Sequence, residues 1–315
     1  MKLKKLLFLT VLGLTASATF TSCEDILGHW EKPTPVTPTP SDSETPSEPE
    51  EESVPGLLTG KFTINSAGNQ VQFSRGNLQA KIASYSSNVA IASAWQFAAN
   101  QYDCIGNAAG NNSFAVDSWV DLFSWVGTSA GNDTYGLITF NSNSQANHGN
   151  DATEVLKTDW GTAAASSIGT GWRTLTKDEW NYLFNETTRT DTRYCKATVN
   201  GKSGVVLFPD SYTHPADGGT VPASVNTANA EFGTNTWTAA QWTAMETAGA
   251  VFLPVTGERS GTSVSYAVSS ARYWSSTAYS DVDAYYVSFN SSNLSPADGG
   301  SRFNGHSVRL VRPVD

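Results

Sequence analysis

The residues whose types and spacing suit chemistry lie mainly between positions 271 and 315, and that chemistry is non-covalent contact. No Lys follows Lys202 and no Glu follows Glu258, so Ser, Asn, Asp and Tyr fill the polar positions. Rigid aromatic rings supply contact area and short polar groups supply adaptable hydrogen bonds, as in an antibody paratope. A surface that needs only solubility would use Lys and Glu. We therefore predict a ligand-contact face made of Tyr279, Asp281, Asp283, Tyr286, Ser288, Asn290, Ser295, Asp298, Ser301 and Phe303.

Residues 283–290 alternate in the manner of a half-buried strand. Tyr285, Val287 and Phe289 fall on one side, which we expect to face the core. Ala284, Tyr286, Ser288 and Asn290 fall on the other side, which we expect to face a ligand. The alternative is a Ser- and Asn-rich exported surface that binds nothing.

Catalytic and metal-binding patterns are missing from the sequence. It contains no CxxC, no HExxH and no His/Cys cluster, so we predict no metal and no cofactor. Asp281 and Asp283 offer two oxygens, too few for Ca²⁺. No GxSxG elbow is present, and Glu179 is better explained as a helix-capping residue than as one of a catalytic carboxylate pair. We predict that the protein is not an enzyme.

The cysteines leave one question open. After Cys23 only Cys104 and Cys195 remain, and an exported domain either pairs them or keeps two buried thiols.

Charge argues against nucleic acid as a partner. The net charge of the chain is −10. Residues 1–23 contribute +3 and residues 24–55 contribute −8, so residues 56–315 carry a net charge of −5. A mildly acidic domain without basic clusters does not suit nucleic acid or anionic lipid.

The first 55 residues predict export and tethering. Lys2, Lys4 and Lys5 precede a short apolar run, and Phe20-Thr-Ser-Cys23 resembles a bacterial lipobox. We predict a lipoprotein signal peptide over 1–22, acylation of Cys23 and an acidic Pro-rich disordered tether over 23–55. Glu24-Asp25 resembles the export tag of surface lipoproteins in Gram-negative gut anaerobes, so we expect outer-membrane or cell-surface display. The alternative is an ordinary secretory signal.

Residues 56–315 predict one α+β domain with short antiparallel strands, two helices and long ordered loops. The segments 61–64 and 70–73 alternate around Gly68-Asn69 and predict a hairpin. Capping boxes open helices at Thr176 and Thr238, and Gly249 ends the second. We also expect short buried strands at 205–208 and 251–253, and a helical or turn segment at 121–125. Pro-Ala-Asp-Gly-Gly, at 215–219 and 296–300, predicts a reused turn.

Four motifs in order carry a family resemblance. They are Gly171-Trp-Arg-Thr-Leu-Thr-Lys-Asp-Glu-Trp180, Phe252-Leu-Pro254 with Gly257 and Arg259, Tyr273-Trp-Ser-Ser-Thr277, and Val308-Arg-Leu-Val-Arg312. Together they resemble the C-type lectin-like fold in its formylglycine-generating-enzyme (sulfatase-modifying-factor) branch, and the surface lipoproteins of gut bacteria that share it. The branch's catalytic members use two cysteines near the carboxyl end, and this chain has none after Cys195.

The resemblance extends to variable proteins of diversity-generating retroelements, whose last gene segment is rewritten at adenines. Tyr, Ser, Asn, Asp and Gly, the residue types that such rewriting makes from an Asn codon, occupy every polar position and both glycines of residues 280–301. We expect Trp172, Trp180, Trp274, Phe289 and the strand at Val308 to form the scaffold. The expected function is binding of an external protein or glycan at the cell surface. A fixed-specificity carbohydrate-binding adhesin and a structural subunit of a surface appendage are the alternatives.

Overall fold

The structure, a computed structural model, describes residues 54–87, 89–131, 137, 148–184, 191 and 193–314. These residues belong to one compact unit, Glu52–Asp315. The predicted signal peptide, Cys23 and all but the end of the predicted tether lie outside the described residues. No helix in the described part of the chain has the length and apolar character needed to cross a membrane.

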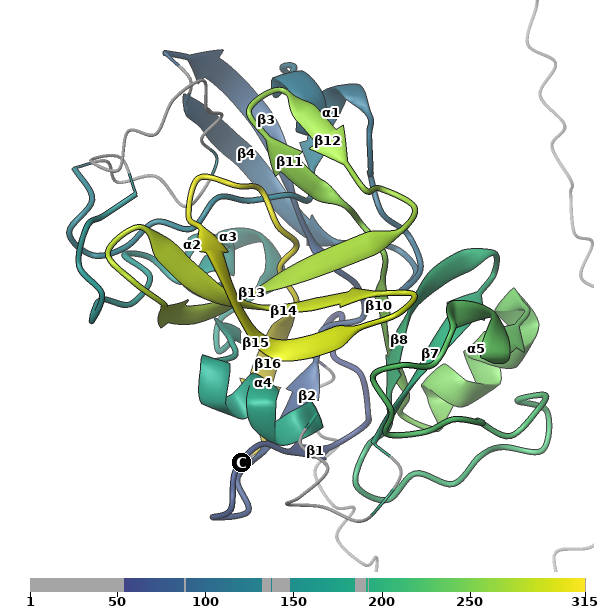
Figure 1. Ribbon diagram of the computed structural model, residues 1–315. Coiled ribbons are helices and arrows are strands. Elements are labelled where there is room, and N and C mark those ends of the chain that lie inside the picture. The colour runs from purple at the N-terminus through teal and green to yellow at the C-terminus, as the bar shows by residue number, and fades with distance from the viewer. Residues whose placement is uncertain are drawn as a thin grey trace, which may run out of the picture. The chain divides into compact units, whose positions relative to one another are not determined.

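The described residues form an α+β structure rich in short strands (Figure 1). The strands are β1 (Phe62–Thr63), β2 (Gln70–Phe73), β3 (Leu78–Ser86), β4 (Val89–Phe97), β5 (Trp119–Val120), β6 (Arg173–Thr174), β7 (Tyr194–Val199), β8 (Lys202–Leu207), β9 (Thr236–Trp237), β10 (Val251–Pro254), β11 (Glu258–Ser260), β12 (Ser263–Ser265), β13 (Ser270–Ala278), β14 (Asp283–Asn290), β15 (Leu294–Ser301) and β16 (Leu310–Pro313). The helices are α1 (Ala109–Ser113), α2 (Trp160–Ala163), α3 (Ala165–Ile168), α4 (Lys177–Phe184) and α5 (Ala239–Thr247), with a 3₁₀ turn at Phe232–Thr234.

The strands pair into small sheets. The C-terminal strand, β16, pairs with β2 near the start of the domain sequence. β16 lies between β2 and β6 and pairs antiparallel with both. The other orders are β10-β8-β7-β9, β13-β14-β15, β4-β3-β5 and the ribbon β11-β12. The predicted hairpin is confirmed as β1 and β2, with Gly68 at φ +84° in the turn.

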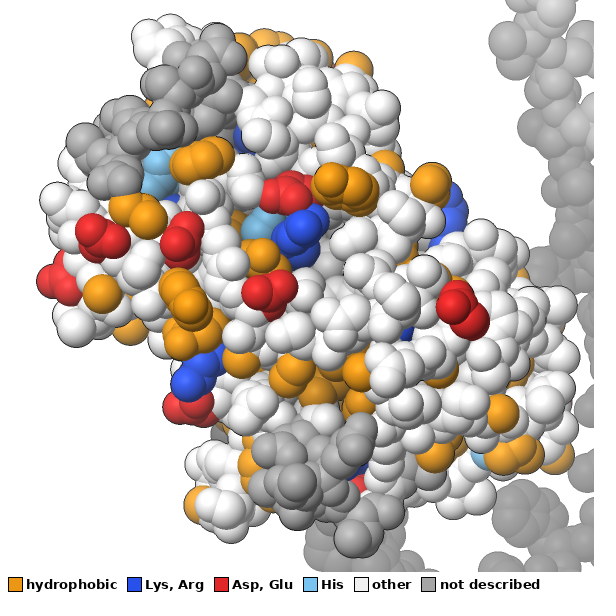
Figure 2. Space-filling model, viewed as in Figure 1, with side chains coloured by type: hydrophobic (Ala, Val, Ile, Leu, Met, Phe, Trp, Pro, Cys, Tyr) orange, Lys and Arg blue, Asp and Glu red, His pale blue; other side chains and the backbone are white. Residues whose placement is uncertain are grey.

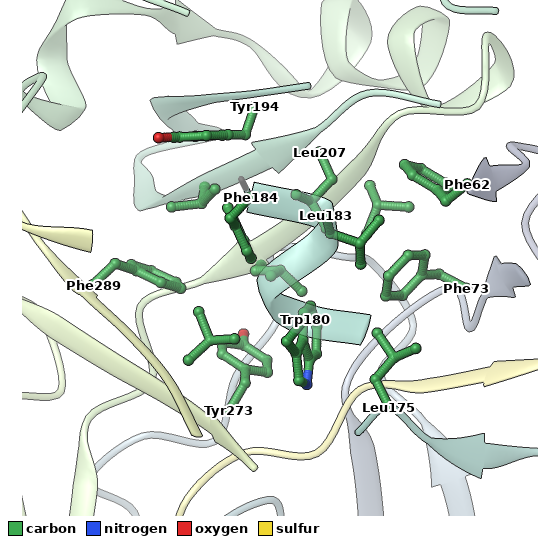
Figure 3. Packing of buried hydrophobic residues seen from close by; sticks show 14 of the residues in the cluster. Phe62, Phe73, Leu175, Trp180, Leu183, Phe184, Tyr194, Leu207, Tyr273 and Phe289 are labelled. Carbon is green, nitrogen blue, oxygen red and sulfur yellow. The ribbon is translucent and has the colours of Figure 1, made fainter. Parts of the chain in front are cut away.

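Helix α4 lies in one of the two large apolar clusters of the described residues. Its predicted capping box is confirmed, since Glu179 N donates to Thr176 Oγ1 (3.2 Å) and Thr176 N donates to Glu179 Oε2 (2.8 Å). Trp180 lies between Phe73 on one side and the rings of Tyr273 and Phe289 on the other (Figure 3). Because these side chains come from separate sheets, α4 holds the sheet of β16 against the sheet of β14.

Helix α5 has the second predicted capping box, formed by Thr238 and Gln241, and ends at Gly249 with φ +93°. Its buried Trp242 and Met245 pack on β7, β8 and β10. The strands expected at 205–208 and 251–253 are β8 and β10, which pair antiparallel and are buried.

The tryptophans expected to build the scaffold are buried, as are Phe289 and Val308. The Trp274 ring nitrogen donates to the Phe123 carbonyl (2.6 Å), and that of Trp180 donates to the Trp274 carbonyl (3.3 Å). Each ring therefore combines a large apolar area with a satisfied N–H group, the arrangement that a buried tryptophan needs.

Two sequence predictions about local structure are wrong. Residues 121–125 are extended, not helical or turned, because Phe123 exchanges both backbone hydrogen bonds with His306. The Pro-Ala-Asp-Gly-Gly at 215–219 does form a turn, but the copy at 296–300 runs through β15. The local preference is overridden in both cases by backbone pairing, with distant His306 in the first and with the neighbouring strand β14 in the second.

Cys104 and Cys195 are both free thiols. Burial raises the pKa of both thiols, that of Cys104 to about 11 and that of Cys195, which is fully buried in β7, well above its usual value. Both therefore stay protonated at neutral pH.

Candidate functional site

The sheet β13-β14-β15 carries the predicted contact face, and its register sorts the side chains onto two faces. Trp274 pairs with Tyr286 and Arg272 with Ser288, while Tyr286 pairs with Asp298. Paired residues of antiparallel strands point to the same side of a sheet. We call this side the Arg272 face. The opposite side carries Val287 and Phe289 and packs on α4.

The predicted orientation of β14 is confirmed in its second half. Val287 and Phe289 are buried, and Ser288 and Asn290 are half-buried on the Arg272 face. In the first half of β14 the buried and solvent-facing sides are the reverse of the prediction. Tyr286, expected to contact ligand, is only 7% exposed, and Tyr285, expected in the core, is half-buried.

The side chains of β14 alternate between the two faces of the sheet as predicted. The prediction failed because other segments bury part of the face that was expected to meet ligand. Ala284 and Tyr286 pack with Trp274 in a second apolar cluster. The Tyr286 ring lies 5.7 Å from the Trp274 ring and 4.7 Å from the His306 ring. Tyr286 therefore forms the floor of the Arg272 face and presents no free ring to solvent.

The other nine predicted contact residues are half-buried or exposed, but they do not share one face. Ser288, Asn290, Ser295 and Asp298 lie on the Arg272 face. Asp283 and Ser301 pair with each other on the opposite face, and Asp281 and Phe303 lie in the turns after β13 and β15. The prediction of a single contact face is wrong in this respect.

Two glycines of β15 leave room for a tyrosine ring close to the backbone on each face of the strand. A Cβ at Gly299 would meet the Tyr279 ring at 2.7 Å, and a Cβ at Gly300 would meet the Tyr286 ring at 3.0 Å. Tyr279 is half exposed and also packs edge-on against Tyr285, with ring centroids 4.8 Å apart. Tyr279 therefore belongs to the face opposite Arg272.

Charged and aromatic side chains from distant segments converge on the Arg272 face. An ion pair joins Arg272 Nη1 to Glu258 Oε2 of β11 (2.6 Å). Asn304 Nδ2 donates to the other carboxylate oxygen, Glu258 Oε1, and His306 Nε2 lies 3.5 Å from that same atom. Figure 2 shows basic, acidic and histidine side chains gathered in a hollow in the middle of this view, over the sheet seen in Figure 1.

The hollow holds Arg272 between two aromatic rings. Its guanidinium carbon lies 5.9 Å from the centre of the Tyr266 ring and 5.8 Å from that of Tyr286. Such contacts orient a guanidinium and add about 0.5–1 kcal/mol at exposed sites. Asp298, which is exposed, accepts a hydrogen bond from Ser288 Oγ (3.0 Å).

Burial sets the protonation states in the hollow. Burial lowers the pKa of His306 to about 4, so its imidazole is neutral at pH 7. Burial also opposes ionisation of Glu258, but the hydrogen bond from His306 and the charge of Arg272 outweigh it and hold that pKa below its usual value. Glu258 is thus an ionised anchor for Arg272, and the polar side chains that reach solvent beside it are those of Arg272, Ser288 and Asp298.

Sequence reasoning missed Tyr266, Arg272, Asn304 and His306, and it considered Glu258 only as a catalytic acid. They come from four segments that local patterns do not connect. Tyr266 had a usable signal, because Tyr266 and Val268 interrupt a run of small polar residues.

A buried ion pair supports the end of the sheet. Arg302 pairs with Glu154, both almost fully buried, and its Nη2 donates to the Ser280 carbonyl (2.6 Å) and the Asp151 carbonyl (2.9 Å). Its guanidinium stacks on Trp125 at 4.6 Å. Residues 148–154 are thereby fastened to the turn between β13 and β14.

Other hollows are less suited to a ligand. A cavity of about 290 Å³ between β1, β2 and the end of α5 is lined by Gln70 and Asp210 among others. Gln70 Nε2 donates to Asp210 (2.8 Å), which also binds the Thr63 backbone (2.9 Å), so the cavity's polar groups already bind one another. No group of three potential metal ligands occurs among the described residues.

Comparison of the chain with family models, with curated proteins and with solved structures yields no match.

Proposed function

We propose that this chain is a lipid-anchored surface protein that binds an external ligand through the Arg272 face, without catalysing a reaction. The observation that carries the proposal is the hollow around Arg272. Five separate segments place charged, hydroxyl and aromatic groups around it, and a rigid aromatic core supports them. Sites with convergent polar groups on a preformed apolar base are typical of ligand recognition.

The fold that we propose is C-type lectin-like, of the formylglycine-generating-enzyme branch. Three features support it. The Trp172–Trp180 motif leads into a capped helix under the sheet, the Tyr273–Thr277 motif forms β13, and the Val308–Arg312 motif closes a sheet with β2. Determining the crystal structure tests the fold, and a different strand order would overturn it.

Anchoring at Cys23 is proposed from the lipobox alone. We expect cells expressing the full chain to incorporate radiolabelled palmitate into it, and Cys23→Ser to abolish both the label and membrane retention. Label that persists in the variant, or a wild-type chain without label, would contradict the anchor. Protease shaving of intact cells tests outward display separately.

The binding function is tested with arrays of glycans and of purified host and bacterial surface proteins, probed with the full chain. We expect a hit that Arg272→Ala weakens about tenfold or more, because the variant removes the guanidinium that orients the Tyr266 ring and Glu258 at the centre of the hollow. Arg75→Ala, remote in sequence from the hollow, is the control. Hits that are indifferent to Arg272→Ala would contradict this site.

Hypervariation of the last segment is a separate proposal. It predicts a nearby non-coding copy of that gene segment differing only at adenines. Absence of such a copy beside a reverse-transcriptase gene would leave a binder of fixed specificity. A carbohydrate-binding adhesin is the second candidate, and the half-exposed ring of Tyr279 close to the backbone of β15 is the observation that favours it.

A further inference from the structure

A stiff turn at the rim of the hollow displays two apolar side chains. Val268 is 88% exposed and Tyr266 is 59% exposed, both between β12 and β13. The backbone N–H groups of Ser269 and Ser270 donate to the Tyr266 carbonyl at 3.0 and 3.1 Å. Across the turn, a Cβ at Gly257 would meet the Ser265 carbonyl oxygen at 2.5 Å, so the backbones are in close contact. Hydrogen bonds and close backbone contacts therefore fix the conformation of the turn, although its two apolar side chains are exposed to solvent.

Tyr266 is also held in an unfavourable conformation. Its φ is +59°, in the left-handed region that a bulky residue rarely adopts. Strained backbone of this kind persists where the surrounding structure imposes it, and it concentrates at functional sites. Here the strain turns the ring over Arg272 at the rim of the hollow.

The charges of this region favour a cationic ligand group. Arg272 is paired with Glu258, Arg302 with Glu154 and Lys177 with Asp178. Asp298 is exposed and has no cationic partner within 4 Å among the described residues. A ligand that carries a carboxylate, sulfate or phosphate would meet uncompensated negative charge, whereas a lysine or arginine would be attracted.

We propose that the partner of this face is a protein surface that presents a lysine or arginine to Asp298 and an apolar socket to Tyr266 and Val268. The inference rests on the binding function proposed above and specifies its ligand. An aliphatic side chain such as Val268 has no ring face or hydrogen-bonding group to offer a sugar. An apolar anchor beside a charged group is instead the usual composition of a protein–protein contact.

The probe is a phage-displayed library of random twelve-residue peptides, selected on the full chain at low ionic strength. We expect the selected peptides to combine Lys or Arg with apolar residues. The variant Asp298→Asn should bind them about tenfold more weakly, and 0.5 M NaCl should remove most of that difference. Asp217→Asn removes the same charge from an exposed position elsewhere and should leave binding within about twofold.

The apolar part is tested with Val268→Ser, which should also weaken binding about tenfold because the valine loses its buried contact. Val221→Ser changes a similarly exposed valine on another loop and is the matched control.

Selected peptides without basic residues, or peptide binding that Asp298→Asn does not change, would overturn the inference about charge. If Val268→Ser still weakened the binding of those peptides, the proposed binding function would stand. If the chain bound an arrayed glycan and Ser288→Ala weakened that binding, the ligand would be a glycan and not a protein. The proposed binding function would still stand. If neither peptides nor arrays gave binding sensitive to any variant of this face, the function and the inference would both fall.

Discussion

Tyr266 shows how one residue separates stability from binding. Asn tolerates the left-handed conformation better than Tyr, which offsets the loss of the contact with Arg272. We predict that Tyr266→Asn keeps the free energy of unfolding within about 1 kcal/mol of wild type. Binding of the selected peptides should nevertheless fall about tenfold. Urea unfolding and peptide titration measure the two effects, and a loss of both in proportion would make Tyr266 a structural residue.

His306 makes stability depend on pH. The folded protein keeps this imidazole neutral with a pKa of about 4, whereas in the unfolded chain it gains a proton below about pH 6.5. The unfolded state therefore binds more protons in this window. The free energy of unfolding should fall by about 3 kcal/mol as pH drops from 6.5 to 4.

The variant His306→Phe keeps the ring packing against Trp274 and removes this titration. We predict that its free energy of unfolding changes by about 3 kcal/mol less than that of wild type between pH 6.5 and 4. Urea unfolding at the two pH values measures the difference. If the variant does not fold, an NMR titration of the wild-type imidazole decides the same point, and a pKa near 6.5 would refute it.

At the scale of the element, β15 depends on its two glycines, and they differ in tolerance. The ring that a Cβ at Gly300 would strike belongs to buried Tyr286, whereas the ring near Gly299 belongs to half-exposed Tyr279, which has room to move. We predict that Gly300→Ala lowers the free energy of unfolding by about 1–3 kcal/mol and Gly299→Ala by less than about 1 kcal/mol. Thermal unfolding of the two variants is the measurement, and equal losses would contradict the packing described.

Elements with their own boundary signals are the ones that the sequence predicts well. The capping boxes at Thr176 and Thr238 and the hairpin at Gly68 are local, so sequence neighbours suffice to specify them. The segment 121–125 and the second Pro-Ala-Asp-Gly-Gly were predicted wrongly. Pairing with His306, which is distant in sequence, extends the segment 121–125. Pairing with β14 extends the second Pro-Ala-Asp-Gly-Gly.

At the scale of the whole molecule, the ion pair of Arg302 and Glu154 links residues 148–154 to the turn before β14. Removing one partner leaves a buried charge, so we predict that Arg302→Met lowers the free energy of unfolding by about 3–5 kcal/mol. Lys81→Met breaks the exposed pair with Asp117 and should cost less than about 1 kcal/mol. Chemical denaturation compares the two variants. A small effect of Arg302→Met would show that the link is dispensable.

The sequence by itself determined the α+β composition, the two capped helices, the burial of the tryptophans and the outward place of Ser288 and Asn290. These depend on periodicity and on neighbours within a few residues. Only the tertiary structure decided that Tyr286 lies under the surface, that Asp283 and Ser301 face away from Arg272, and that Glu258, Tyr266 and His306 meet at one hollow. The reason is physical. Alternation says which side chains share a face, but whether that face meets water depends on which distant segments pack against it.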